Sequence, residues 1–425
     1  MTHLSGILDN HVYWGEGALS QLDNLFINTC EKQTKKTNSS TDPNLVSRHG
    51  DILGWGHRPV TENYRNILLF VDKIGFDLCG AADYFKTWER KTHKKNIKKI
   101  SYAGKALPID DIEKIYIDIK TGTSVAAADA DVIIAVGGGT IIDLAKIISI
   151  AFSNQCEKVE EVLDNKELEN KIPLIFIPTT AGTGSETTSF AVVYRDKVKI
   201  SIEHKSLLPD AIILDPLLLR SLPEPVLHST LLDALAQATE SIWAVGSTAE
   251  SKEYSGKAIP LILDNIDKED KKTIDRLSSL QQASYWAGKA INISKTTLSH
   301  SISYPITAHL RIPHGIAVFL TLAEVAKLNY FTSLENKQDK IDIEKIEQDF
   351  SLIFSLYGVK KIELLVKKLK NVMIRLKVKT QLRDYGVKEG DLAFVASNAL
   401  TKGRSDNNPR KMSEDEVLKL LRNIF

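Results

Sequence analysis

The chain has 425 residues, 43% of them hydrophobic, and its 55 lysines and arginines nearly cancel its 54 aspartates and glutamates. This length and apolar content suffice for about two or three domains with sizeable cores. The near-neutral charge removes the electrostatic support for a nucleic-acid partner. Without a basic leader or a run of about 20 apolar residues, we expect a cytoplasmic protein with no membrane partner. Its three cysteines, Cys30, Cys79 and Cys156, are far apart in the sequence and odd in number, so we expect free thiols.

The first half of the sequence alternates short apolar runs, typical of buried strands, with helical patterns. Such alternation predicts a twisted, mostly parallel sheet whose ligands gather at the carboxyl ends of its strands. The predicted helices lie at residues 81–91 and 109–121, and the second carries isoleucines at helical spacing. The predicted strands lie at residues 11–14, 66–71, 99–102, 131–136 and 171–178.

One segment of this half, residues 31–63, has no periodic pattern. It is polar and rich in Lys, Thr, Ser, Asn, Gly and Pro, and it is long for a structureless connection inside a compact domain. Two interpretations are open, a mobile insertion and a functional flap. We favour the insertion.

The sequence DVIIAVGGGTIIDLAK, residues 131–146, joins a buried strand to a helix through three consecutive glycines. Gly137, Gly138 and Gly139 can adopt positive φ and let the backbone approach a ligand closely. The helix that begins at Thr140 directs free N–H groups and its positive dipole end at the same place, which suits a pyrophosphate. A tight turn without a ligand is the alternative, because short glycine motifs are common.

From about residue 223 onward the strand patterns give way to helical ones, at residues 226–245, 256–265, 272–290 and 315–328 among others. Asp233 and Gln237 lie four apart in LLDALAQATESIW and so share one helix face. His300 lies in an apolar helix and His314 in a Pro-His-Gly turn. Two histidines and a carboxylate form a ligand set that suits a catalytic divalent metal. Either histidine alone is better explained as a hydrogen-bonded core residue, and only the combination indicates a metal.

Four motifs follow one another along the chain: GGGTIIDLAK, PTTAGTGSE, the helix Asp233-Ala-Leu-Ala-Gln, and His300 with His314 in the PHG turn. In this order and spacing they resemble the iron-containing (group III) alcohol dehydrogenase family. The resemblance covers nearly the whole chain apart from residues 31–63. Within the family, HSISYP, DALAQATESIW and residues 183–215 are most similar to the phosphonoacetaldehyde reductases.

The resemblance implies a dehydroquinate synthase-like fold, with a Rossmann-like α/β domain at residues 1–222, an all-α domain at residues 223–425, and the chemistry in the cleft. Asp72 matches the family's acidic residue at the end of an early strand. A carboxylate there binds a ribose 2′-hydroxyl and repels a 2′-phosphate, so we favour NAD(H) over NADP(H). Lys146 is expected to support the glycine turn together with Asp143. The cofactor-binding residues that the resemblance implies are Asp72, Gly137, Gly138, Gly139, Thr140, Asp143, Thr179, Thr180, Gly182, Thr183 and Ser185.

The resemblance also implies a divalent metal, Fe²⁺ or Zn²⁺, on Asp233, His300 and His314. The family pattern has a histidine where this chain has Gln237, whose neutral amide oxygen is a weaker ligand than imidazole. Weaker metal binding, or even a metal-free enzyme, would follow from that difference. Tyr304 stands where many relatives carry a further histidine. It is expected either to act beside His300 and His314 as a catalytic residue that protonates the alkoxide, or to be a core tyrosine bonded to backbone.

The implied reaction is hydride transfer from a reduced nicotinamide to an aldehyde, with phosphonoacetaldehyde as the substrate and 2-hydroxyethylphosphonate as the product. Lys199, Lys205 and Arg404 are the cations named for the phosphonate, although each is also explained as an ordinary surface charge. Two alternatives are a metal alcohol dehydrogenase for uncharged aldehydes and a catalytically idle nucleotide-binding protein whose metal site decayed at Gln237. A homodimer is expected.

Overall fold

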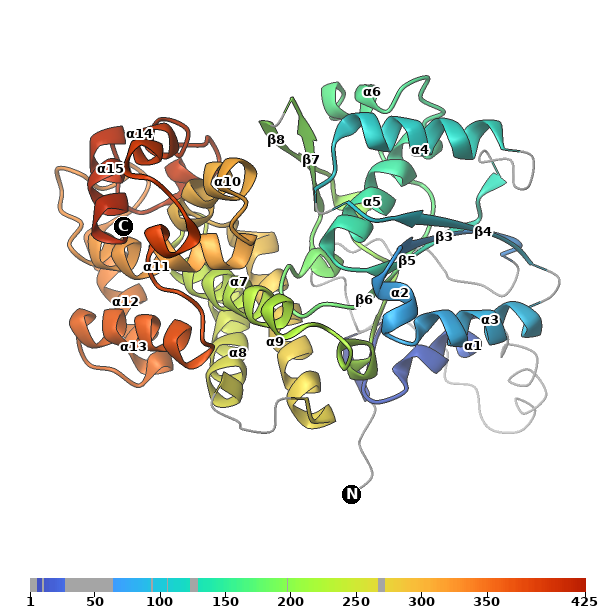
Figure 1. The fold of residues 1–425 in the computed structure, drawn as a ribbon, viewed down its shortest axis with the longest axis horizontal. Helices are drawn as coiled ribbons and strands as arrows, with labels where there is room; N and C mark the ends of the chain where they lie inside the picture. The colour runs from blue at the N-terminus through green and yellow to red at the C-terminus, as the bar shows by residue number, and fades with distance from the viewer. Residues whose placement is uncertain are drawn as a thin grey trace, which may run out of the picture. The chain divides into compact units, whose positions relative to one another are not determined.

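The computed structural model describes residues 6–9, 11–26, 64–92, 95–104, 106–122, 129–196, 198–266 and 272–425. They form two compact units, coloured from blue to green and from green to red in Figure 1. The first unit comprises Met1–Thr179 and Ser189–Ser221, and the second comprises Thr180–Thr188 and Leu222–Phe425. Residues 31–63, for which the sequence predicts an insertion, lie outside the described residues.

The first unit is built on a seven-stranded sheet, in the part of the chain that the structure describes, with the order β1-β2-β9-β6-β5-β3-β4. Every pairing in it is parallel except that of β1 with β2 at one edge. The chain passes from β3 outward to β4 and then returns to β5 on the other side of β3. Ligands of such sheets bind where the strand order reverses in this way. The strands are β1 (Gly6–Asp9), β2 (Val12–Trp14), β3 (Asn66–Asp72), β4 (Asn96–Tyr102), β5 (Val132–Gly137), β6 (Leu174–Pro178) and β9 (Ala211–Leu214).

The sheet register brings the predicted cofactor residues to one edge. Asp72 is the last residue of β3, and its neighbour Val71 pairs with Val136 of β5. Gly137, the last residue of β5, pairs with Pro178 of β6. The carboxyl ends of three adjacent strands therefore meet, and the glycine turn and the loop after β6 begin at the same edge.

Helices cover both faces of this sheet (Figure 1) because its central strands β3, β5 and β6 are apolar on both sides. One face packs Phe70 and Phe176 against α4 (Ile109–Thr121) and α5 (Gly139–Ser153) in a single core. On the other side lie α1 (Gln21–Phe26), α2 (Gly75–Leu78) and α3 (Ala81–Lys91). There Trp88 packs edge-on against Phe26 and Phe85, with ring centroids 5.3 and 5.6 Å apart.

A two-stranded antiparallel hairpin, β7 (Phe190–Arg195) and β8 (Val198–Glu203), follows the loop after β6. This hairpin was not predicted from the sequence. Ala191 and Val193 of β7 join the core over α5, whereas no residue of β8 is fully buried and Val198, Ser201 and Glu203 are exposed. A hairpin with one buried and one solvated side is typical of an antiparallel pair. It differs from the continuous apolar runs by which the parallel strands were found.

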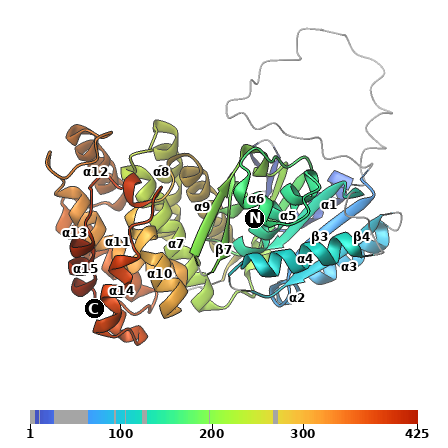
Figure 2. The same cartoon turned by 90° about the horizontal axis from the view of Figure 1, so that it is seen from above.

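The second unit is helical, and its longest elements surround a central buried helix, α7 (Glu224–Trp243), as the two views show (Figures 1 and 2). From Leu227 to Trp243 almost every residue of α7 is buried, because α8, α9 and α11 all pack against it. The other main helices are α8 (Ala249–Ile266), α9 (Ile274–Ser294), α10 (Leu298–Leu310), α11 (His314–Tyr330), α12 (Ile343–Tyr357), α13 (Ile362–Arg375), α14 (Glu389–Ser397) and α15 (Glu414–Asn423).

The predicted fold class, a Rossmann-like α/β part followed by a helical part, is confirmed. The predicted helices at residues 81–91 and 109–121 have the bounds of α3 and α4. The helix predicted at residues 256–265 was too short, since α8 begins at Ala249. Its first turns, AESKEYS, are polar and lack the apolar run that marked the rest. Among the described residues no helix is long and apolar enough to cross a membrane.

Candidate active site

The glycine turn joins β5 directly to α5. Gly138 is the N-cap of α5, and its carbonyl accepts hydrogen bonds from the N–H groups of Ile141 and Ile142 at 3.0 and 3.2 Å. The preceding N–H groups, in the first turn, have no intrahelical partner and point along the helix axis. Gly138, Gly139 and Thr140 are half-buried. A 15-residue helix that begins this way at the edge of a parallel sheet offers an anion both N–H donors and a positive dipole end.

The glycines of this turn are not there for positive φ, which corrects the sequence-based explanation. None of the three has positive φ, and Gly138 lies at φ −78° and ψ −175°. At Gly137 the reason is packing, because a Cβ would lie 2.6 Å from the side chain of Ile141 in the first turn of α5. The strand can enter its helix this tightly only without a side chain at Gly137.

Asp72 stands at the end of β3, beside β5, where the sequence predicts a ribose contact. Its Oδ1 accepts hydrogen bonds from the N–H of Ile74, at 3.0 Å, and from that of Gly75. The carboxylate therefore closes the turn that leads into α2. One of its two oxygens is used in this way, so a structural role accompanies whatever ligand role Asp72 has.

Asp143 and Lys146, predicted to support the glycine turn, face β7. Asp143 Oδ2 accepts a hydrogen bond from the N–H of Val192 at 3.0 Å. The ammonium of Lys146, which is fully buried, donates to the carbonyl of Phe190 at 2.9 Å. Both side chains thus fasten the hairpin to α5.

The loop after β6 carries the predicted residues Thr179 to Ser185. Thr179 donates its N–H to the carbonyl of Gly137 at 3.1 Å, which ties the start of the loop to the glycine turn. Thr180 and the residues that follow it belong to the second unit. There a Cβ on Gly182 would lie 2.3 Å from Thr230 of α7, and one on Gly184, at φ +60°, would lie 2.5 Å from Gly288 of α9. These two glycines let the loop lie directly on two helices.

The predicted metal ligands come together in the second unit. Asp233 of α7, His300 of α10 and His314 of α11 each offer a ligand atom within 4.8 Å of the others. Asp233 Oδ1 lies 3.3 Å from His300 Nε2 and 3.9 Å from His314 Nε2. Asp233 and His300 are buried, and His314 is half-buried. It is the only such group of histidine, cysteine and carboxylate side chains in the described ranges.

The Pro-His-Gly turn explains how α11 reaches this cluster. His314 is the first residue of α11 and Pro313 is its N-cap. A Cβ on Gly315 would lie 1.8 Å from the carbonyl oxygen of Ser229 and 2.9 Å from Cβ of Asp233. Only glycine lets the start of α11 contact α7 at the turn that holds Asp233, so the motif places His314 beside the carboxylate.

Gln237 lies one helical turn after Asp233 and is 4% exposed. Its Nε2 donates to the carbonyl of Thr183 at 3.3 Å, while its Oε1 is buried and has no hydrogen-bond partner. His300 Nε2 is also buried without a hydrogen bond. A buried acceptor without a partner is costly. Carboxylate oxygen, two imidazole nitrogens and an amide oxygen would suit a divalent transition metal, so the residues present fit the predicted ion.

Glu240 was missed by the sequence analysis. It is fully buried on α7, and its Oε2 pairs with His300 Nδ1. Burial opposes both charges, but Glu240 and Asp233 raise the pKa of His300 to about 9. Likewise, against its burial, the pKa of Glu240 is lowered by His300 and by hydrogen bonds from Thr297 and Ser299. The available signal was spacing: positions 233, 237 and 240 recur at helical intervals on one face of α7.

Tyr304 and Arg404 lie in the second unit, whereas the other two predicted substrate cations, Lys199 and Lys205, lie in the first. The ring of Tyr304 stacks on that of His314, with centroids 6.3 Å apart and planes 19° apart. Arg404 belongs to the same unit and is half-buried, and its Nη1 donates to the carbonyl of Gly403 in its own turn. Lys199 and Lys205 lie in the first unit, on β8 and on the short 3-10 helix Lys205–Leu207.

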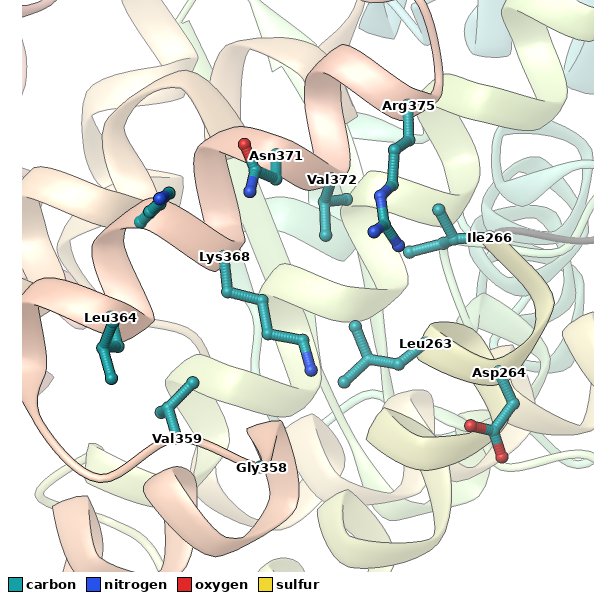
Figure 3. Close-up of a pocket in the computed structure, with 11 residues that line it drawn as sticks. Leu263, Asp264, Ile266, Gly358, Val359, Leu364, Lys368, Asn371, Val372 and Arg375 are labelled. Carbon is teal, nitrogen blue, oxygen red and sulfur yellow. The ribbon is translucent and has the colours of Figure 1, made fainter.

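A hollow of about 870 Å³ lies elsewhere in the second unit (Figure 3). Lys368, one of its lining residues, donates to the carbonyl of Tyr357 at 2.6 Å and so caps the end of α12. No residue predicted for the site lines this hollow, whose walls come from the end of α8, the turn after α12 and α13: Leu263, Asp264, Ile266, Gly358, Val359, Leu364, Lys367, Lys368, Asn371, Val372 and Arg375.

Known proteins are similar to this chain in sequence and in fold. Residues 94–216 match the family described as iron-containing alcohol dehydrogenase, and residues 228–425 match the C-terminal part of the Fe-containing alcohol dehydrogenase family. The phosphonoacetaldehyde reductase of Streptomyces viridochromogenes is 27% identical over 332 residues, which cover 74% of this chain and 83% of that protein. The sulfoacetaldehyde reductase of Bilophila wadsworthia is 30% identical over 304 residues, which cover 70% and 78% respectively.

The solved structure of an alcohol dehydrogenase from Oenococcus oeni has the same fold, with a TM-score of 0.75 at 23% identity over 85% of this chain and 93% of that one. The sequence matches extend over both units, and the cluster of Asp233, His300 and His314 fits the metal that the family name states. The chain therefore belongs to the iron-containing alcohol dehydrogenase family and is an NAD(P)-dependent oxidoreductase of aldehydes and alcohols that uses a divalent metal.

Proposed function

We propose that this protein reduces phosphonoacetaldehyde to 2-hydroxyethylphosphonate and uses NADH for the reduction. The observation that carries the proposal is the chemistry shared by two relatives, which are named as reductases of phosphonoacetaldehyde and of sulfoacetaldehyde. Both aldehydes have two carbons and end in a strongly acidic group. A site that accepts either must neutralise an anion close to the reacting carbonyl.

The dinucleotide is assigned to the carboxyl edge of the sheet in the first unit. Gly137, Gly138 and Gly139 would receive the pyrophosphate on the N–H groups at the start of α5. Asp72 would accept a hydrogen bond from a ribose 2′-hydroxyl and repel a 2′-phosphate, which is the basis for preferring NADH over NADPH. The nicotinamide, when bound, supplies the hydride to the aldehyde carbon.

The metal is assigned to Asp233, His300 and His314, with Gln237 Oε1 as a weak fourth donor. When bound, the ion supplies a Lewis acid that polarises the carbonyl oxygen. The aspartate and the two histidines would fix its position, since Asp233 lies on α7, His300 on α10 and His314 on α11. Tyr304, stacked on His314, is the proposed proton donor, whose Oη would protonate the alkoxide formed by hydride transfer.

The anionic end of the substrate is assigned to Arg404, with Lys199 and Lys205 as the weaker candidates. A guanidinium binds a phosphonate through two parallel hydrogen bonds, which a lysine cannot do. Arg404 lies in the unit that holds Asp233 and the histidines, and the nearby Thr401 donates its N–H to Ser301, the residue after His300. The homodimer and the cytoplasmic location stay predictions.

The test is a panel of aldehydes, phosphonoacetaldehyde, sulfoacetaldehyde and butanal, each assayed with NADH and with NADPH. We expect the highest kcat/KM for phosphonoacetaldehyde with NADH. Arg404→Gln should raise KM for the two anionic aldehydes and leave that for butanal unchanged, whereas the exposed neighbour changed in Lys402→Gln should affect none of them. A wild-type preference for butanal would contradict the proposal and favour an alcohol dehydrogenase for uncharged substrates.

A further inference from the structure

The carboxylate of Glu240 holds a position that the proposed reaction does not yet use. It lies on α7, two helical turns beyond Asp233, and none of its surface is exposed to solvent. Isolated carboxylates are almost never buried so completely, because desolvation of the charge is costly. The groups that surround Glu240 must therefore compensate for its burial.

The two oxygens of Glu240 have separate partners. Oε1 accepts a hydrogen bond from Thr297 Oγ1 at 2.7 Å and another from the N–H of Ser299 at 2.8 Å. Oε2 faces His300 Nδ1. Ser299 lies in the first turn of α10, so the carboxylate also meets the positive end of that helix.

The direction of the bond from Thr297 is fixed by Trp243. The indole Nε1–H of Trp243 can only donate, and it donates to Thr297 Oγ1 at 3.0 Å. The hydroxyl of Thr297 accepts that bond and has one proton left, which goes to Glu240 Oε1. Oε1 is thus held as an acceptor by two donors that cannot change roles, the Thr297 hydroxyl and the Ser299 backbone N–H.

We propose that Glu240 is a positioning residue that holds the ring proton of His300 on Nδ1 and so presents Nε2 as the metal ligand. The ring nitrogen on the far side from Glu240 is the one that lies 3.3 Å from Asp233 Oδ1. A ligand histidine whose other ring nitrogen donates to a carboxylate is fixed in both tautomer and orientation. The inference rests on the metal site of the proposed function.

This arrangement predicts an unusual sensitivity to Glu240→Gln. The two fixed donors require an acceptor at the Oε1 position, so the amide of glutamine must place its oxygen there and its NH₂ against His300 Nδ1. A donor facing Nδ1 stabilises the tautomer with the proton on Nε2, which cannot bind a metal. The substitution keeps the size and shape of the side chain at position 240, and yet it turns His300 Nε2 from a metal ligand into a hydrogen-bond donor.

The experiment compares the affinity of metal-stripped wild type, Glu240→Gln and Thr239→Val for Zn²⁺ by competition with a chromogenic chelator. The control Thr239→Val removes a buried hydroxyl on the same helix that bonds Tyr357 instead, at 2.6 Å. We expect Glu240→Gln to bind Zn²⁺ about 10- to 100-fold more weakly, with NADH affinity unchanged, and the control to bind Zn²⁺ like wild type. Equal Zn²⁺ affinity in wild type and Glu240→Gln would overturn the role of Glu240. A wild type without measurable Zn²⁺ or Fe²⁺ binding would instead overturn the metal site itself.

Two further measurements decide the matter if Glu240→Gln does not fold. Glu240→Asp keeps a carboxylate and should restore part of the affinity that glutamine loses. In zinc-loaded wild type labelled with ¹⁵N-histidine, the ring proton of His300 should be found on Nδ1. A proton on Nε2 would contradict the proposal without any substitution.

Discussion

The glycine turn of the first unit and the buried cluster of the second would bind their expected ligands by opposite means. The turn offers backbone N–H groups at the start of α5, and three consecutive residues are enough to form this site. The cluster offers side chains from α7, α10 and α11, which are separate in sequence and meet only through packing. A backbone site is thus encoded locally, whereas a side-chain site depends on the whole helical core.

Because the two sites are built differently, each should be open to damage without the other. Damage to the turn should affect dinucleotide binding alone, and damage to the cluster should affect metal binding and turnover alone. Each of the following substitutions tests whether the two sites can be separated in this way.

The largest effect is expected from His300→Ala. Loss of a buried metal ligand removes the Lewis acid, which contributes several kcal/mol, so kcat/KM should fall on the order of 1,000-fold or more. NADH affinity, measured by fluorescence titration, should stay within about twofold of wild type. The matched control is His309→Ala, on the same helix, because His309 is exposed and its ring packs against Phe394, away from the cluster's residues. A comparable loss in both variants would mean that α10, and not the ligand, is being tested.

Gly138→Val should have the next largest effect, on the other site. A side chain at the N-cap of α5 would occupy the space of the pyrophosphate, and loss of hydrogen bonds to a charged group should weaken NADH binding at least about tenfold. Zn²⁺ affinity should not change. Gly137→Ala is the comparison: its Cβ would lie 2.6 Å from Ile141, so it should lower the free energy of unfolding by about 1–3 kcal/mol. Unchanged NADH affinity in folded Gly138→Val would place the dinucleotide elsewhere.

Gln237→His should strengthen the cluster. An imidazole at this position is a better ligand than an amide oxygen. We therefore expect the affinity for Zn²⁺ or Fe²⁺ to rise by roughly tenfold or more over wild type, with activity kept or raised. Gln237→Leu serves as the control, since it loses both the amide oxygen and the hydrogen bond to Thr183. If histidine and leucine bind metal equally, the side chain at Gln237 does not reach the ion.

The smallest effect is expected from Asp72→Ser, which should shift the ratio of kcat/KM for NADPH over NADH upward by about tenfold. The shift follows from relief of the repulsion between the carboxylate and a 2′-phosphate. Serine keeps an oxygen for the turn that Asp72 closes at Ile74. Asp77→Ser, in the same segment and exposed, should leave the ratio unchanged. A wild type that already prefers NADPH would show that Asp72 does not face the ribose.

The features encoded locally could be predicted from the sequence, whereas those that depend on packing between distant segments could not. The strands β3, β5 and β6 were predicted because parallel strands buried on both faces are continuous apolar runs. The hairpin of β7 and β8 was missed because its strands alternate and β8 is polar on one side. For the glycine turn, positive φ was the wrong explanation, since none of its three glycines has positive φ and packing against Ile141 accounts for Gly137. Gly182 and Gly184 make close contacts with Thr230 and Gly288 that no local pattern reveals.

In the cluster, the candidate ligands could be identified from the sequence, whereas the residues that surround them could not. Asp233, His300 and His314 are residue types that bind metals, so a sequence draws attention to them. Glu240 is a carboxylate in the last turn of α7, and solvent exposure is the usual expectation for such a side chain. Its burial depends on Thr297 and Ser299, which reach it only when α10 packs on α7.

The most direct test of the central claim is to remove the metal and measure both functions of the same enzyme. The purified protein is treated with a chelator, dialysed, and assayed for aldehyde reduction and for NADH affinity, before and after Fe²⁺ or Zn²⁺ is added. We predict that turnover falls by at least about 100-fold and returns with the metal, because the Lewis acid acts on the carbonyl, while NADH affinity stays the same throughout. Aldehyde reduction at the full rate by metal-free enzyme would contradict the account and leave Tyr304 and the two histidines to stabilise the alkoxide by themselves.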